Sequence, residues 1–341
     1  MNGETLRQNF IKVYRDNNIP INVFKAAHGF SLLCEAEPNS AAIGMGIAPN
    51  TYLGIRLCDE DSFYVRFPGS EMQYECSRNK LSEYSQNDCA EPIFKTIARL
   101  LKGNESISGA QLYFQCECDE EKFAEYKAVL VYGMGTILGM NTSGENLMKF
   151  IYPDTMNFSE NARNIITLSS AENRCEAIEK TEISFFSLPF GGCKLVIGKT
   201  DTKPLKSVEY DEKKLDMGIA AYKGSDEYNK INYAINEKER FKQAKEALKH
   251  GEYARLGHII RRSSCEYLSV VKKNGSNLKM LFDMAAESSI ICGIYERSGI
   301  YAIVEDNRVD SFIKAVGAAY ERKIGKRPDF YVCAAATTKA E

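Results

Sequence analysis

Hydrophobic residues recur along the chain with two periods, one helical and one extended. Leu6, Phe10 and Val13 lie three to four residues apart, which is helical spacing and predicts an amphipathic helix over 5–18. Apolar runs rich in β-branched and aromatic residues predict strands instead. Up to residue 200, the pattern predicts strands at 21–24, 30–34, 52–57, 63–67, 111–114 and 194–197, and helices at 93–101, 123–138 and 144–152.

The last third of the chain has the most regular pattern. Helices are predicted at 226–249, 253–271 and 278–286. Two apolar runs, 290–295 and 300–304, flank a turn around Ser298 and predict an antiparallel hairpin. A helix over 309–320 should bury alternate positions of this hairpin, and 330–332 should form a closing strand. This order of elements predicts an α+β fold, with helices on one face of a sheet and two closely joined halves.

Length and charge restrict the class of protein. A chain of 341 residues favours two domains, and 44% hydrophobic with 26% charged residues is ordinary globular composition. The formal net charge of −2 gives no overall attraction to nucleic acid or to an anionic membrane, so we expect neither as a partner. The N-terminal residues lack the apolar segment of a secretory signal, and no run is long enough to span a bilayer. We expect a cytoplasmic protein.

The cysteines agree with this location. There are eleven of them, at spacings that match no disulfide framework, and the odd number favours a reducing compartment. Cys116 and Cys118 lie beside acidic residues, but they are too close together for a zinc knuckle and no second Cys or His pair lies nearby. We therefore expect no metal site.

The stretch 188–214 is the most informative in the chain. Its sequence, LPFGGCKLVIGKTDTKPLKSVEYDEKK, joins an apolar strand, a Thr/Lys loop and a helix start at Tyr210. It resembles the middle of a galactokinase, and further similarity to this family of GHMP kinases follows in step at 25–36, 46–52 and 312–332. The resemblance covers nearly the whole chain.

This resemblance implies a two-lobed GHMP kinase fold of the α+β class. A ribosomal-S5-like N-terminal lobe would span 1–180 and a ferredoxin-like C-terminal lobe 181–341, with the active-site cleft between them. The family's catalytic arginine falls on Gly29 and its catalytic aspartate on Asn161. Neither residue can do the family's chemistry, because glycine carries no charge and an amide cannot accept the proton of a sugar hydroxyl. A shifted alignment would leave Asp154, Glu160 or Glu172 as a substitute carboxylate.

The implied sugar site is better retained. Glu35 and Tyr210 fall on sugar-binding positions of the family, and Glu37 is a candidate replacement for a lost acceptor. The alternative for Tyr210 is an aromatic residue packed at a helix start. His28 stands where the family has glycine; we expect it to be a turn residue, with a new catalytic role as the alternative.

Both glycine-rich motifs that the family uses for phosphate are missing. The first corresponds to 118–128, which contains no glycine and carries Asp119, Glu120 and Glu121 where the triphosphate would lie. These carboxylates suit the first turn of a helix instead. The second corresponds to the hairpin at 293–300, from which the glycine run is absent.

The resemblance and the losses together predict a galactokinase-family protein whose kinase activity is lost or strongly reduced. Such a pseudokinase would sense a sugar or another small metabolite, or bind a protein whose identity stays open. The alternative is an active sugar kinase of this family that uses substitute residues, and a new reaction in the same cleft is a third possibility. The sequence predicts no cofactor firmly. If kinase activity is retained, we expect the cofactor to be Mg-ATP.

Overall fold

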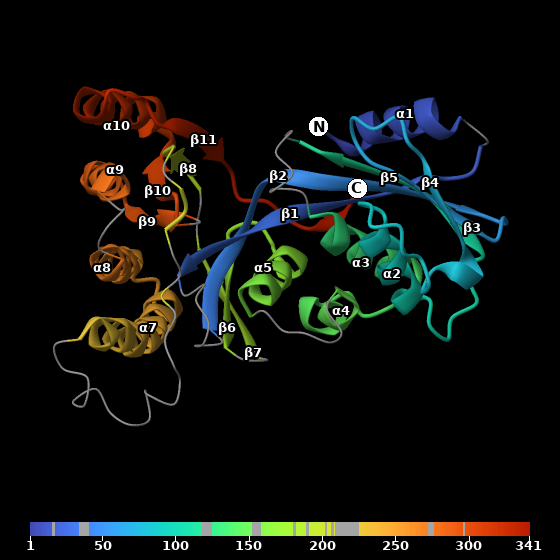
Figure 1. Cartoon of the computed structure of the whole chain (residues 1–341), viewed down its shortest axis with the longest axis horizontal. Helices are drawn as coiled ribbons and strands as arrows, with labels where there is room; N and C mark the ends of the chain where they lie inside the picture. The colour runs from blue at the N-terminus through green and yellow to red at the C-terminus, as the bar shows by residue number, and fades with distance from the viewer. Residues whose placement is uncertain are drawn as a thin grey trace. The chain divides into compact units, whose positions relative to one another are not determined.

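The computed structural model describes residues 1–15, 18–33, 41–117, 125–151, 158–179, 182–188, 191–201, 203–205, 208, 225–271, 276–295 and 297–341 (Figure 1). The chain forms two compact units, and both are discontinuous in sequence. The first consists of Met1–Phe30, Met45–Glu172 and Ala336–Glu341, and the second of Ser31–Gly44 and Asn173–Ala335. The resemblance to galactokinases implies a single lobe boundary between residues 180 and 181, and this boundary stays a prediction.

A mainly antiparallel sheet forms the centre of the first unit. Its strands run in the order β12-β1-β2-β5-β3-β4, and β3 is parallel to β5. Their bounds are β1 Asn22–Leu33, β2 Ala41–Cys58, β3 Ser62–Arg66, β4 Tyr74–Ser77, β5 Gly109–Cys116 and β12 Lys339–Ala340. The two strands predicted at 21–24 and 30–34 are one strand, β1. The small residues between them, Ala26, Ala27 and Gly29, have little strand propensity but are buried, and burial decides their conformation.

Helices cover this sheet on both faces (Figure 1). Leu6 of α1 packs with Val23 and Tyr52, whereas the neighbouring strand residues Phe24 and Leu53 belong to the large core cluster under the other helices. The bounds are α1 Gly3–Tyr14, η1 Arg78–Lys80, α2 Glu91–Leu100, α3 Tyr126–Ile137, α4 Gly144–Ile151 and α5 Phe158–Ser169. The helix α5 was not predicted, because its serine and asparagine residues have low helix propensity.

The second unit contains two strand pairings of its own. The first four residues of β2 pair with β6 (Arg174–Glu179), and β6 pairs with β7 (Glu182–Ser187). A separate antiparallel sheet has the order β11-β8-β10-β9. Its strands are β8 Cys193–Lys199, β9 Ile291–Tyr295, β10 Gly299–Glu305 and β11 Asp329–Cys333. The predicted hairpin and closing strand are therefore confirmed.

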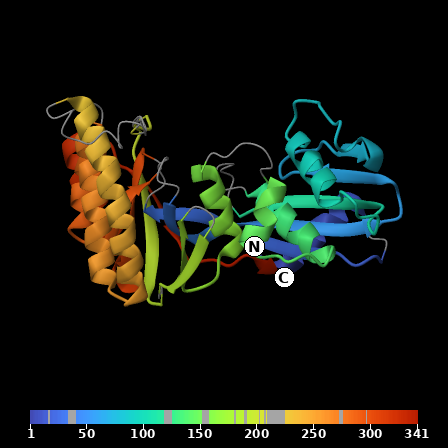
Figure 2. The ribbon, with the colours of Figure 1, turned by 90° about the horizontal axis from the view of Figure 1, so that it is seen from below.

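One layer of helices packs on this second sheet, as Figures 1 and 2 show. The helices are α7 Asp226–Lys249, α8 Tyr253–Val270, α9 Ser276–Ala286 and α10 Val309–Ile324, with η4 Asp306–Arg308 before the last. Ile300, Ala302 and Val304 of β10 share a core cluster with Phe312 and Val316 of α10, as the alternation predicted. Within the part of the chain that the structure describes, no helix is long and apolar enough to cross a membrane.

Candidate functional site

The predicted site residues fall into two groups. Gly29 and the backbone of Asn161 are described, the first in β1 and the second in α5. Glu35, Glu37 and Tyr210 lie outside the described residues, so their placement stays a prediction. The same holds for the carboxylates at 119–121 and for two of the three substitute carboxylates, Asp154 and the side chain of Glu160. The third, Glu172, is exposed.

Gly29 lies at a close approach of α5 to β1. A Cβ atom at this position would overlap the carbonyl oxygen of Arg163 and lie 2.7 Å from Thr167 Oγ1. It would also lie 3.0 Å from Cγ of Arg163. The backbone of a helix cannot give way as a flexible side chain can, so this position accepts glycine and no larger residue without a shift of α5.

The same approach of α5 creates a cluster of ionisable side chains, which we call the Glu125 cluster: His28, Glu125 and Arg163. The Nδ1 atom of His28 lies 2.9 Å from Glu125 Oε1, and Nε of Arg163 lies 3.6 Å from the same oxygen. The side chains of His28 and Glu125 are only 3% and 5% exposed, whereas that of Arg163 is 35% exposed. The prediction that His28 is a turn residue is wrong, because the burial of β1 extends through it and holds it in a strand.

Glu125 belongs to the start of α3. Its backbone N–H donates to Thr51 Oγ1 at 2.9 Å in a buried hydrogen bond. It occupies the N-cap position of α3, yet its side chain makes no capping hydrogen bond to that helix. The carboxylate is directed instead toward the two basic side chains. The structure thus brings together, within one compact unit, positions 29 and 125 and the helix that carries Asn161.

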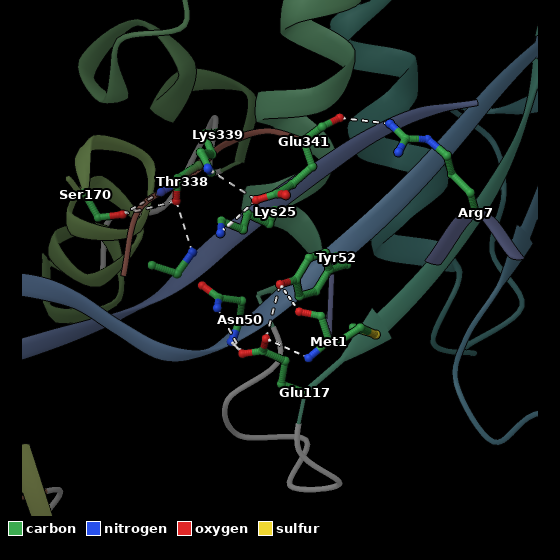
Figure 3. A network of polar contacts seen from close by, with 11 residues as sticks. Met1, Arg7, Lys25, Asn50, Tyr52, Glu117, Ser170, Thr338, Lys339 and Glu341 are labelled. Atoms are coloured by element: carbon green, nitrogen blue, oxygen red, sulfur yellow. Dashed lines mark hydrogen bonds and ion pairs between the residues drawn. The ribbon is translucent and has the colours of Figure 1, made fainter. Parts of the chain in front are cut away.

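A second polar network surrounds Glu117, the residue that directly follows β5 (Figure 3). Glu117 Oε2 accepts hydrogen bonds from the backbone N–H and the side-chain amide of Asn50, at 2.7 and 2.9 Å. Its other oxygen accepts one from the Tyr52 hydroxyl at 3.1 Å and lies 3.5 Å from the amino group of Met1. Burial and the adjacent Glu117 carboxylate raise the pKa of Tyr52 above its ordinary value. These contacts fix the end of β5 immediately before residue 118.

Hydroxyl groups fix the other side of α5 (Figure 3). Thr338 Oγ1 accepts a hydrogen bond from the Ala27 N–H at 3.1 Å and donates one to the carbonyl of Thr167 at 2.5 Å. Ser170 donates to the same carbonyl at 3.0 Å. The segment that enters β12 therefore ties α5 to β1 beside Gly29, which keeps the two elements at their close distance.

A different buried carboxylate, which the sequence did not indicate, lies in the second unit. Glu176 of β6 is 0% exposed, and neither of its carboxylate oxygens has a hydrogen-bond partner among the described residues. Nε of Arg174 lies 3.5 Å from Oε1. Burial raises the pKa of Glu176 to about 8, an effect that the charge of Arg174 reduces but does not cancel.

The described residues also bear on cofactors. Nowhere in the described ranges do three or more His, Cys, Asp or Glu side chains gather in a way that could hold a metal ion. The Glu125 cluster contains one acid and two basic groups, which is an arrangement for charge compensation and not for cation binding.

Comparison with known proteins finds similarity to galactokinases. No family model matches the chain. It is 22% identical to the galactokinase of Halalkalibacterium halodurans over 375 aligned positions, which cover 96% of this chain and 95% of that protein.

Solved structures agree with this relationship. The galactokinase of Lactococcus lactis, solved with galactose, has a TM-score of 0.77 at 15% identity, covering 98% of this chain and 99% of that one. The mevalonate kinase of Methanococcus jannaschii has a TM-score of 0.62 at 12% identity and covers 94% and 99%. The extended match to a galactokinase sequence and the shared α+β fold agree: the chain is similar to a galactokinase along nearly its whole length, and it has the fold of galactokinase and mevalonate kinase.

Proposed function

We propose that this protein is a galactokinase relative that binds a sugar or a similar small metabolite and has lost, or retains only weakly, the ability to phosphorylate it. The observation that carries the proposal is the packing at Gly29. This position corresponds to the catalytic arginine of the family, and the backbone of α5 fills the space in which a side chain would begin. The packing of α5 against β1 therefore leaves no room for an arginine side chain at position 29.

The expected effect of this loss on rate is large. Removing one preorganised group that stabilises transition-state charge lowers the rate by about 10²–10³, and removing a general base lowers it by about 10²–10⁴. Position 161 holds an asparagine, so both groups are replaced. The two factors do not multiply fully, because residues that act together are not additive.

The proposal extends to ligands. Asp119, Glu120 and Glu121 would repel a triphosphate. Support for a sugar ligand comes from the Lactococcus lactis galactokinase, which was solved with galactose. Glu35, Tyr210 and Glu37 are the proposed contacts to sugar hydroxyls. A cytoplasmic location is part of the proposal and is supported by the odd number of cysteines without framework spacing.

One observation favours the alternative of an active sugar kinase with substitute residues. Arg163 lies two residues after Asn161 in α5, and its Cγ atom lies close to where a side chain of residue 29 would start. Arg163 could then supply the missing positive charge from a different element. Its ion pair with Glu125 argues against this role, because the charge is already compensated.

Thermal denaturation and a phosphate-transfer assay test the proposal together. Galactose should raise the melting temperature in a saturable way, whereas millimolar Mg-ATP should leave it unchanged. A ligand present at 100 times its dissociation constant adds about 2.7 kcal/mol to stability, which is easily measured. Galactose with Mg-ATP should release no ADP above the background of a sample without enzyme.

Two results would contradict this proposal. A saturable shift with Mg-ATP, together with sugar-dependent ADP release, would establish the alternative, and loss of that activity in Arg163→Met would identify the substitute cation. Failure of galactose and of related sugars to shift the melting temperature would remove the sugar part of the proposal. Arg262→Met is a matched control variant for Arg163→Met, because it removes an exposed arginine side chain of α8.

A further inference from the structure

The Glu125 cluster has an unusual arrangement of charge. One carboxylate oxygen, Glu125 Oε1, is approached by His28 Nδ1 at 2.9 Å and by Arg163 Nε at 3.6 Å. The three side chains come from three different elements, β1, the start of α3 and α5. Glu125 occupies the N-cap position of α3, but its side chain makes no capping hydrogen bond to that helix. Its carboxylate contacts His28 and Arg163 instead.

We infer that Glu125 is an internal anion that fills a site for a small oxyanion, and that His28 and Arg163 form the basic wall of this site. A carboxylate and a phosphate oxygen are recognised by the same basic side chains through the same short contacts. Arg163, with its planar fork of donors, is the residue type best suited to such a group. The site is therefore built for an oxyanion and is closed because the chain supplies its own.

This closure has a consequence for ligands. A phosphate group that approached Arg163 would have to displace a carboxylate that is already covalently attached and 5% exposed. Attachment gives the carboxylate a high effective concentration, so a free anion competes poorly. The inference rests on the proposed loss of nucleotide binding and gives it a cause within the described residues.

Chemical rescue tests the inference. Glu125→Ala removes the carboxylate and leaves a space of the size of a small carboxylate ion between His28 and Arg163. The variant should melt at a lower temperature than the wild type, and formate or acetate should restore at least half of the loss in a saturable way. The wild type should show no such response, because its site is already filled.

Two controls separate this effect from general salt effects. Acetamide has the shape of acetate without its charge, so it should not restore Glu125→Ala. Thr51→Val removes the acceptor of the Glu125 N–H but leaves the carboxylate in place, so it should lose stability without gaining a response to acetate. Ionic strength is kept constant with sodium chloride throughout.

The outcomes are decisive in each case. Equal responses of Glu125→Ala to acetate and acetamide, or no response to either, would overturn the inference. If Glu125→Ala does not fold, Glu125→Gln replaces it: the inference requires this variant to be less stable than the wild type and unresponsive to acetate, since its amide occupies the space. A wild-type melting temperature for Glu125→Gln would show that no charge is needed there. These results are independent of Mg-ATP binding by the wild type, which decides the proposed function alone.

Discussion

Glu125 and Glu176 are both buried glutamates, but they differ in the number of basic side chains beside them. Glu125, in the first unit, lies within 4 Å of two basic side chains. Glu176, in the second unit, has a single basic neighbour and no hydrogen bond to either oxygen among the described residues. Burial raises the pKa of Glu176 to about 8, so it carries a proton at neutral pH.

The difference lies in what surrounds each carboxylate: two basic side chains approach Glu125, whereas burial dominates at Glu176 and raises its pKa. The compensation at Glu125 depends on how closely α5 approaches β1, because that approach carries Arg163 to the carboxylate. Among the described residues only Arg174 approaches Glu176, and burial favours the protonated form of this carboxylate. The first site is therefore sensitive to packing and the second to pH.

We expect the largest effect on stability from a substitution at Gly29, because it disturbs the packing that brings Arg163 to Glu125. Gly29→Ala places a Cβ atom against the carbonyl of Arg163, so α5 must move away from β1 and carry Arg163 with it. We expect the free energy of unfolding to fall by about 3 kcal/mol or more, measured by urea denaturation. Gly191→Ala is the matched control, because no atom lies within 4 Å of a Cβ there, and it should be close to neutral. Equal stability of the two variants would refute the close approach.

Glu176 should make the stability of the protein depend on pH. Its pKa in the folded protein, about 8, lies above its ordinary value near 4.5, so the folded state holds a proton that the unfolded chain has released between these values. Its contribution to stability is thus complete below pH 4.5 and is lost as pH rises toward 8. The loss amounts to about 1.4 kcal/mol for each pH unit at most.

Glu176→Gln should remove this slope. The variant should match the wild type near pH 5 and exceed it in stability at pH 8, as followed by thermal or urea denaturation at both pH values. The difference between the two proteins isolates this group from the other titrating residues. A parallel pH dependence in both would mean that Glu176 is ionised in the folded protein.

The smallest expected effects come from the two arginines, which form a matched pair with 35% and 36% side-chain exposure. Arg163→Met removes one of the two basic side chains that the described residues place beside Glu125, so it should cost about 1–2 kcal/mol, less than the 3–5 typical of a fully buried pair. Arg174→Met should cost about 0.5 kcal/mol, because Glu176 already holds a proton and the exposed stacking of Arg174 on Phe185 contributes little. Urea denaturation at pH 7 gives both values, and the reverse order would contradict the comparison.

The sequence predicted best where local signals were strong. The long helix predicted at 226–249 agrees with α7, because Ser225 accepts a hydrogen bond from the N–H of Tyr228 and acidic residues occupy its first turn. The C-terminal hairpin was equally clear, since its two apolar runs flank a short turn. The helix α5 was missed because packing against β1, and not propensity, determines it.

The candidate site could be predicted only in part. The resemblance to galactokinases placed Gly29 and Asn161 at catalytic positions, but their surroundings depend on contacts between distant segments. His28, Glu125 and Arg163 are separated along the chain and form no motif, so no pattern could connect them. Glu176 was missed for a different reason: an acidic residue between apolar residues in a strand indicates a solvent-facing position, whereas Glu176 is 0% exposed.

The segment Ala336–Glu341 belongs to the first unit, and this has a consequence for folding during synthesis. β12 pairs with β1, and Thr338 joins Ala27 to the end of α5. On the ribosome, these residues emerge only after the whole of Asn173–Ala335 has been made. The first unit must therefore wait, with one edge of β1 unpaired, while the second unit is translated. Such an exposed edge can pair with another chain, so the nascent protein is most prone to aggregation during this interval.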